Sequence, residues 1–135
     1  VEVIETLSPV VFWKKEYRPD SGGPGEHRGG LGQIMEIANG EPAPMIISAT
    51  FDRIAHPARG TAGGHEGGGG RVSLKSGTVL RGFGRQVIPA GDRVVLETPG
   101  GGGIGDPKMR SRAELERDVK NGLVTPEQAK DVYGL

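Results

Sequence analysis

Apolar runs separated by clusters of glycine and proline are the main pattern over the first hundred residues. Apolar and polar residues alternate with a period of two over 1–5, and β-branched and aromatic residues gather over 10–17. Short runs of this kind, bounded by turn residues, predict β-strands. We expect about eight strands, at 1–5, 10–17, 31–38, 45–51, 71–74, 78–80, 86–88 and 93–97. This count predicts a mainly β fold, a sandwich or a partly open barrel of short antiparallel strands with glycine-rich loops.

The connections between these runs carry turn residues. Asn39-Gly40-Glu41-Pro42 predicts a tight turn and an antiparallel hairpin between 31–38 and 45–51. Lys75-Ser76-Gly77 predicts a second hairpin, and Pro89-Ala90-Gly91-Asp92 separates the last two runs. The glycine-rich stretches at 18–30 and 52–70 predict loops. The second exceeds the roughly 12–15 residues usual for structureless loops, so we expect it to be functional, covered by a partner, or mobile.

The pattern changes after PGGGGIGDP at 99–107. Ser111 and Glu114 form a capping box ahead of apolar residues at helical spacing, and Asn121-Gly122 would end that helix. A second helix start, with a cap, a first-turn proline and a reciprocal cap, is predicted at Thr125, Pro126 and Gln128. We therefore expect a glycine-rich β domain over 1–107 and a small carboxy-terminal helical hairpin over 108–135 packed on it.

Composition excludes several classes of function. Lysine plus arginine and aspartate plus glutamate both number 17, so no global field attracts nucleic acid or an anionic membrane. The absence of cysteine removes disulfides, thiolate metal sites and a cysteine nucleophile, and is typical of a reducing compartment. No run approaches the roughly 18 apolar residues of a membrane span. We expect a cytoplasmic protein with no nucleic-acid and no membrane partner.

The glycine run also has the spacing of a dinucleotide-binding fingerprint, at Gly100, Gly102 and Gly105. In that motif the last glycine opens a helix, whereas here Asp106-Pro107 follows and the helix is expected only near Ser111. A structural glycine loop is the favoured interpretation.

Few side chains have the spacing of a catalytic or metal-binding site. His27, His56 and His65 fall on predicted loops without metal-ligand spacing, although His65-Glu66 is an adjacent pair, so we assign no metal ligand. Asp52-Arg53 follows an apolar run and is either a local ion pair or part of a site at a strand end. Arg28 is an anion clamp or, as we prefer, a loop anchor. Asp20 and Ser21 are expected to bond to the backbone of their own turn. The weak candidates for catalysis are Arg28, Asp52, Arg53 and His65.

Three blocks of the sequence resemble the end of the hydantoinase B family. They are RPDSGGPGEHRGGLGQ at 18–33, GDRVVLETPGGGGIGDP at 91–107 and NGLVTPEQAKDVYG at 121–134, in the order found in that family. The family comprises B-type subunits or regions of ATP-dependent hydantoinases, 5-oxoprolinases and acetone or acetophenone carboxylases. The resemblance implies the carboxy-terminal part of a larger enzyme subunit, inactive alone, and the non-methionine first residue, Val1, in a strand-like run agrees with a missing amino-terminal part.

The resemblance further implies a division of labour between subunits. A hydantoinase A type partner would bind ATP, and the rest of the B-type subunit would supply the metal and most catalytic groups for hydrolysis of a cyclic amide such as a hydantoin or 5-oxoproline. ATP and a divalent metal are thus expected in the whole enzyme, with no cofactor in this part. Residues of the two glycine-rich loops would face substrate or partner: Asp20, Ser21, Gly22, Gly23, Gly102 and Asp106. The alternatives are a non-catalytic assembly module and part of a related ketone carboxylase.

Overall fold

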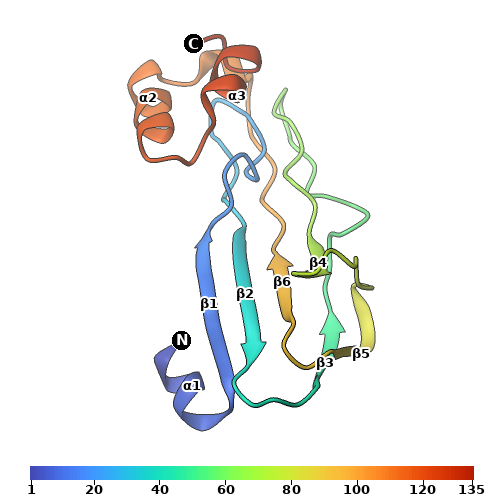
Figure 1. Cartoon of the computed structure of the whole chain (residues 1–135). Coiled ribbons are helices and arrows are strands. Elements are labelled where there is room, and N and C mark those ends of the chain that lie inside the picture. Colours follow the sequence, from blue (N-terminus) through green and yellow to red (C-terminus); the bar gives the residue numbers. More distant parts are fainter.

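The computed structural model describes residues 1–135 of an elongated molecule, with the strands and the amino-terminal helix at one end and the two carboxy-terminal helices at the other (Figure 1). Near the amino terminus lies helix α1 (Glu2–Leu7). The strands are β1 (Val10–Tyr17), β2 (Gln33–Asn39), β3 (Met45–Thr50), β4 (Arg71–Leu74), β5 (Phe83–Ile88) and β6 (Arg93–Glu97). A 3-10 helix, η1 (Pro107–Met109), then precedes α2 (Arg112–Lys120) and α3 (Pro126–Asp131).

The six strands form two antiparallel sheets. One sheet has four strands in the order β1-β2-β6-β4, and the other consists of β3 and β5. The predicted mainly β fold with small carboxy-terminal helices is confirmed, with six strands in open sheets in place of about eight.

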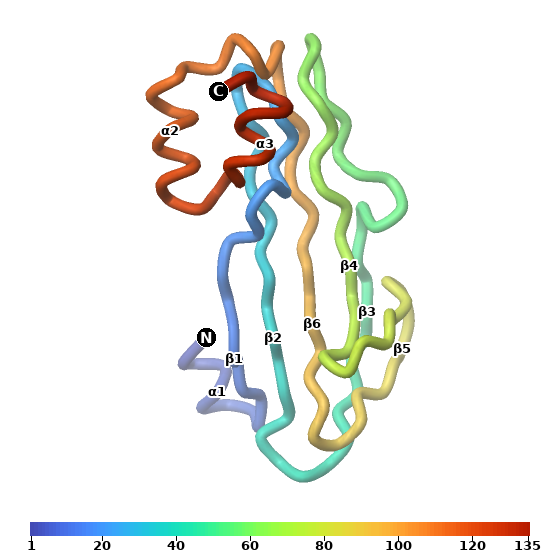
Figure 2. The backbone as a smooth tube through the Cα atoms, turned by 45° about the horizontal axis from the view of Figure 1, so that its top comes forward, coloured from blue at the N-terminus to red at the C-terminus, as the bar shows by residue number.

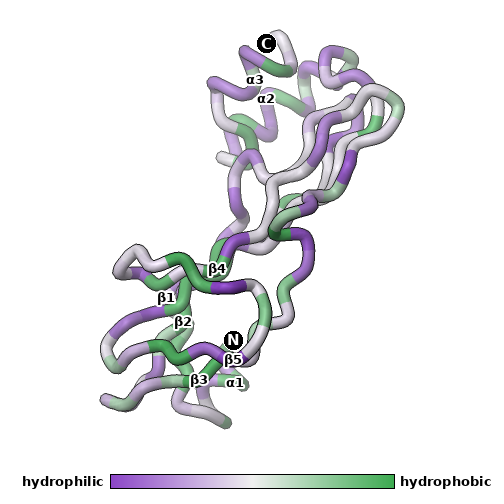
Figure 3. Tube along the Cα trace, turned by 90° about the vertical axis from the view of Figure 1, so that its right-hand side faces the viewer, coloured by the Kyte–Doolittle hydropathy of each residue, from purple (hydrophilic) through white to green (hydrophobic).

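Apolar side chains from both sheets meet in one cluster. Val72 and Leu74 of β4, Ile88 of β5 and Val94 of β6 are buried there, and Ile47 of β3 packs against them. Because a two-stranded sheet is only marginally stable by itself, this shared core is what holds β3 and β5 on the larger sheet. Figure 3 shows apolar positions concentrated near the strands, whereas the glycine-rich segments have intermediate hydropathy.

The expectation of a strand over 1–5 is wrong, because these residues form α1. Val3, Ile4 and Leu7 also fit helical spacing, and so short a run does not decide between the two periods. The carboxylate of Glu5 accepts a hydrogen bond from the backbone N–H of Phe12 at 2.7 Å, so α1 closes part of the free edge of β1.

The predicted hairpin between 31–38 and 45–51 is also wrong. The Asn39-Gly40 connection carries the chain from one sheet to the other, since β2 pairs with β1 and β6 whereas β3 pairs with β5. The turn at 75–77 does fold the chain back: the N–H of Leu74 donates to the oxygen of Thr78, and that of Leu80 to Val72, both at 2.8 Å. The returning arm, however, forms only an isolated bridge between Ser73 and Val79.

The two carboxy-terminal helices form a hairpin with a small core of its own. Leu115, Val124, Ala129 and Tyr133 are buried against one another. Gly122 takes a φ of 68° directly after Asn121, the C-cap of α2, as the Asn121-Gly122 signal predicted. The side chain of Thr125 caps α3 by accepting from the N–H of Gln128, whereas Ser111 precedes α2 without a side-chain hydrogen bond.

Candidate functional site

The glycine-rich segments 21–32, 58–68 and 98–105 pack side by side and are hereafter called the glycine lattice (Figure 2). Segment 98–105 bonds to both others through the backbone: Gly23 N–H donates to Gly101 at 2.8 Å, and Gly103 N–H to His65 at 2.9 Å. His65 N–H in turn donates to Pro24 at 2.7 Å. The predicted loops are therefore an ordered lattice in which three distant parts of the chain are joined by backbone hydrogen bonds.

Close backbone approach explains the need for glycine in this lattice. A Cβ atom built on Gly29 would overlap the carbonyl oxygen of Gly101, and one on Gly100 would overlap that of Ser21. A Cβ on Gly23 would lie 2.6 Å from the nitrogen of Gly103. Since real Cβ atoms essentially never approach backbone so closely, any side chain at these positions would force the segments apart.

The run at 100–105 does not have the structure of a nucleotide-binding loop. Its amides at Gly100, Gly101 and Gly103 donate to carbonyl oxygens of other lattice segments. The chain then enters η1, and α2 begins only at Arg112. Most of the amides that would cradle a pyrophosphate are thus already engaged, and no helix follows the last glycine directly.

Asp20 and Ser21 both act inside the fold. The Asp20 carboxylate accepts from the N–H and the hydroxyl of Thr125 at 2.8 and 2.7 Å, so it reaches the helical hairpin and not its own turn. The buried Ser21 hydroxyl donates to the oxygen of Arg18 at 2.6 Å and accepts from the N–H of Gly32 at 2.9 Å. These bonds occupy the polar atoms of both side chains.

Arg28 belongs to a buried ionic cluster that sequence reasoning missed. Its guanidinium donates to Asp118 of α2 through Nε at 3.1 Å and Nη2 at 3.3 Å. Arg110 binds the same carboxylate at 2.9 Å and also donates to the carbonyl oxygen of Glu26 at 3.1 Å. The cluster ties α2 to the glycine lattice.

Tyr133 lies beside this cluster with its hydroxyl buried and without a hydrogen-bond partner, as is Nε of Arg110. Burial raises the pKa of the Tyr133 hydroxyl above its ordinary value, although the nearby charges of Arg110 and Arg28 oppose that rise. The phenol is therefore held neutral in a site surrounded by charge.

The remaining loop candidates, Gly22, Gly102 and Asp106, also have structural roles. Cβ atoms on Gly22 and Gly102 would overlap the oxygens of Gly29 and Arg59, respectively. Asp106 caps η1, accepting from the N–H of Lys108 at 2.9 Å.

The side chains of Asp52, Arg53 and His65 make no hydrogen bond or ion pair with Arg28, whose partners are Asp118 and Gly29. Asp52 and Arg53 are exposed and make no ion pair, with each other or with any other residue. Arg53 has a φ of 56°, a rare conformation for a non-glycine residue. The His65 side chain is exposed, as are those of His27 and His56. No three His, Asp or Glu side chains gather closely enough to hold a metal ion.

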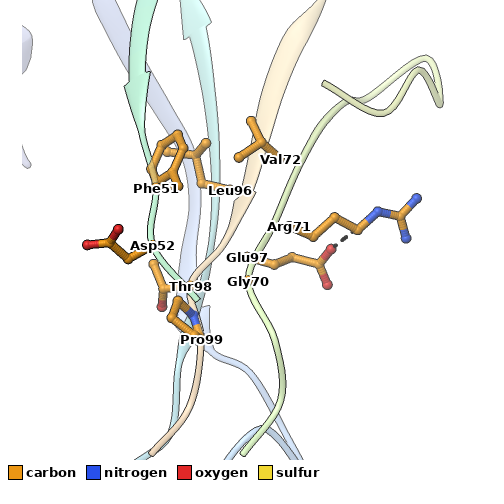
Figure 4. A pocket seen from close by; sticks show the side chains of 9 residues that line it. All are labelled: Phe51, Asp52, Gly70, Arg71, Val72, Leu96, Glu97, Thr98 and Pro99. Atoms are coloured by element: carbon orange, nitrogen blue, oxygen red, sulfur yellow. Dashed lines mark ion pairs between the residues drawn. The ribbon is translucent and has the colours of Figure 1, made fainter. Parts of the chain in front are cut away.

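Two depressions adjoin the end of β3. An open hollow of about 440 Å³ is lined by Phe51, Asp52, Arg53, Ile54, Ala55, His56, Arg81, Gly82 and Phe83. Beside it lies a crevice of only about 10 Å³ between β3, β4 and β6, and Figure 4 shows the side chains that line it. Glu97 at its rim faces Arg71 at 4.0 Å and Arg18 at 3.7 Å. The hollow is the only place where two sequence candidates, Asp52 and Arg53, share a concave surface.

None of the three α-helices is long and apolar enough to cross a lipid bilayer.

Comparison with known proteins confirms the resemblance seen in the sequence blocks. The family model for hydantoinase B/oxoprolinase matches residues 1–107. The chain is 34% identical over 143 residues to the beta subunit of the caprolactamase of Pseudomonas jessenii, covering 100% of this chain and 24% of the relative. It is 35% identical over 108 residues to 5-oxoprolinase 1 of Arabidopsis thaliana, covering 77% of this chain and 8% of the relative.

Solved structures agree. The ATP-dependent caprolactamase from Pseudomonas jessenii matches with a TM-score of 0.81 and 27% identity, over 99% of this chain and 24% of that one. Acetone carboxylase matches with a TM-score of 0.75 over 98% of this chain and 22% of that one, at 21% identity, and shares the fold. The chain thus spans at most about a quarter of the length of these relatives. With residues 1–107 of its 135 matched by the family model, the chain belongs to the hydantoinase B/oxoprolinase family.

Proposed function

We propose that the chain is the carboxy-terminal part of a hydantoinase B type subunit that, with an ATP-binding A-type partner, hydrolyses a cyclic amide of the hydantoin or 5-oxoproline class. The observation that carries the proposal is the match along the whole chain to the beta subunit of a caprolactamase, supported by the TM-score of 0.81. A further relative is the B component of a putative D-/L-hydantoinase from a Pseudomonas strain. Amide resonance makes such a ring hard to open, and ATP can convert its oxygen into a leaving group in a water-excluding site.

Within that subunit, the geometry favours a supporting role for this part. Asp20, Ser21 and Arg28 are engaged in internal hydrogen bonds, and the lattice amides at Gly100, Gly101 and Gly103 already donate to carbonyl oxygens. This donor set fits neither the phosphates of ATP nor a divalent metal. We also propose that the chain divides at residue 107 into a glycine-rich β domain (1–107) and the helical hairpin (108–135).

The enzymatic proposal is tested with the complete subunit and its A-type partner, purified together. Ring opening of caprolactam, hydantoin and 5-oxoproline is measured with and without ATP, and acetone with bicarbonate is supplied in parallel. We expect ATP-dependent opening of one cyclic amide, only when the A-type and B-type subunits are both present. Carboxylation of acetone without amide opening, or amide opening by the 135-residue chain alone, would refute the proposal.

The second candidate, a purely structural module for the complex, is favoured by the same engaged side chains. Gly102→Ala in the complete enzyme separates the two roles, with Gly30→Ala as control because a Cβ on Gly30 meets nothing within 4 Å. Loss of co-purification with the A-type partner would indicate an assembly role. Retained assembly with lost turnover would indicate that this part shapes the reacting site.

A further inference from the structure

The outward face of the small sheet combines apolar side chains with cations that lack partners. Ile46 and Val87 are paired across β3 and β5 and are 56% and 60% exposed, and Phe83, paired with Thr50, is 78% exposed. Arg85, opposite Ser48, is exposed on the same face. This surface, hereafter the β3–β5 face, comprises Ile46, Ser48, Thr50, Phe83, Arg85 and Val87.

The stretch of chain that carries this face is basic although the whole chain is neutral. Between residues 42 and 91 the only acids are Asp52 and Glu66, whereas the bases are Arg53, Arg59, Arg71, Lys75, Arg81 and Arg85. Arg71 and Lys75 pair with acids from other segments. The four other arginines make no ion pair. Two of them, Arg53 and Arg81, line the adjoining hollow with His56 and a single acid, Asp52.

We propose that the β3–β5 face and the adjoining hollow form the docking surface for an acidic, apolar surface of the remaining polypeptide of the same B-type subunit. This inference rests on the proposed function only for the existence of that remaining polypeptide. The whole chain aligns with 24% of the beta subunit of the caprolactamase, so three-quarters of such a subunit lies outside it. That length of chain is enough to cover a surface of this size.

The chemistry of the face favours this occupant over others. A second copy would present the same unpaired arginines, Arg81 and Arg85, to this face, and like-charge contacts are destabilising. A small anion finds no enclosure, because the hollow is open and its basic residues Arg53, His56 and Arg81 are exposed. Exposed apolar side chains on a sheet that is marginal by itself are typical of a permanent contact, not of a transient one.

The occupant is identified by crosslinking in the complete subunit. The photoreactive residue p-benzoylphenylalanine replaces Phe83, which is 78% exposed in this chain and whose phenyl ring the replacement retains. We expect an intramolecular crosslink that mass spectrometry maps to an acidic segment outside these 135 residues. A crosslink to the A-type partner, to a second copy or to RNA, or no crosslink at all, would overturn the proposal. Because this readout does not depend on turnover, an inactive enzyme leaves it intact.

Charge reversal tests the electrostatic part. Arg81→Glu with Arg85→Glu is compared with Arg117→Glu with Lys130→Glu, two exposed and unpaired cations of the helical hairpin. We expect amide hydrogen exchange of segments 45–50 and 83–88 to become at least about tenfold faster in the first pair only. Equal exchange in both pairs would show that no acidic surface covers the face.

Discussion

Alanine substitution at two adjacent glycines gives the sharpest test of the glycine lattice. Gly29 is buried, and a Cβ there would overlap the oxygen of Gly101 and lie 2.6 Å from its carbonyl carbon. Gly30, the next residue, is exposed, and its Cβ would meet nothing within 4 Å. Gly29→Ala and Gly30→Ala therefore add the same methyl group to neighbouring positions with opposite surroundings.

The cost of Gly29→Ala follows from what must move. An ordinary contact requires about 3.4 Å, so segment 100–102 must shift by roughly an ångström. That shift stretches the bonds from Gly23 N–H to Gly101 at 2.8 Å and from Gly101 N–H to Gly30 at 2.9 Å. Overpacking costs about 1–3 kcal/mol and each buried backbone bond about 1 kcal/mol, so the free energy of local opening falls by about 3–5 kcal/mol. Gly30→Ala should leave it unchanged or raise it by about 0.4–1 kcal/mol.

Hydrogen exchange measured by mass spectrometry reports this opening segment by segment in the complete subunit. A loss of about 3–5 kcal/mol corresponds to exchange about 10²- to 10⁴-fold faster over 21–32 and 98–105 in Gly29→Ala. The Gly30→Ala protein should exchange like the unsubstituted one. If both variants exchanged at the same rate, the close backbone packing described above would be refuted.

Three further changes probe the charged and polar contacts. Asp118→Asn leaves Arg28 and Arg110 without their buried counter-charge, so unfolding of α2 should become about 3–5 kcal/mol easier, measured as a lower urea midpoint. The hydrogen bond from Lys75 holds the pKa of Glu36 below its ordinary value, so stability should fall as pH drops below about 4.5. In Glu36→Gln the melting temperature should depend less on pH across that range. Burial raises the pKa of the Tyr133 hydroxyl, so the folded state keeps this proton to higher pH than the unfolded chain, and stability should fall as pH rises above about 10. Tyr133→Phe should abolish that alkaline loss of melting temperature.

Local patterns predicted the elements whose signals lie within a few residues. The β-branched run at 10–17 forms β1 as expected, and Thr125 caps α3. The pairing of strands is a long-range choice, and the turn at 39–42 had no local feature to distinguish a hairpin from a crossing between sheets. Over 1–5 the apolar residues fit both the period of a strand and that of a helix, and so short a run does not decide between them. The structure has α1 there.

The glycine lattice was beyond sequence reasoning for a different reason. Its three segments carry no periodicity, and each glycine is needed because of backbone from another segment, as with Gly100 against Ser21. Asp118, by contrast, left a usable signal. It follows Leu115 by three residues and so falls on the apolar stripe of α2, where a charge requires a partner. Which arginines would meet it could be known only from the fold.

Three polar residues of the 18–33 block make structural contacts. Arg18 donates to the carbonyl oxygen of Gly69 at 2.6 Å, Asp20 holds Thr125, and Arg28 holds Asp118. Each contact joins the block to a segment at least 51 residues away. A substitution in this block therefore loosens the lattice and the helical hairpin together, so lost turnover alone cannot assign a reacting group here. Only a variant with wild-type hydrogen exchange across 21–32 and lost activity would show that one of these side chains touches the substrate.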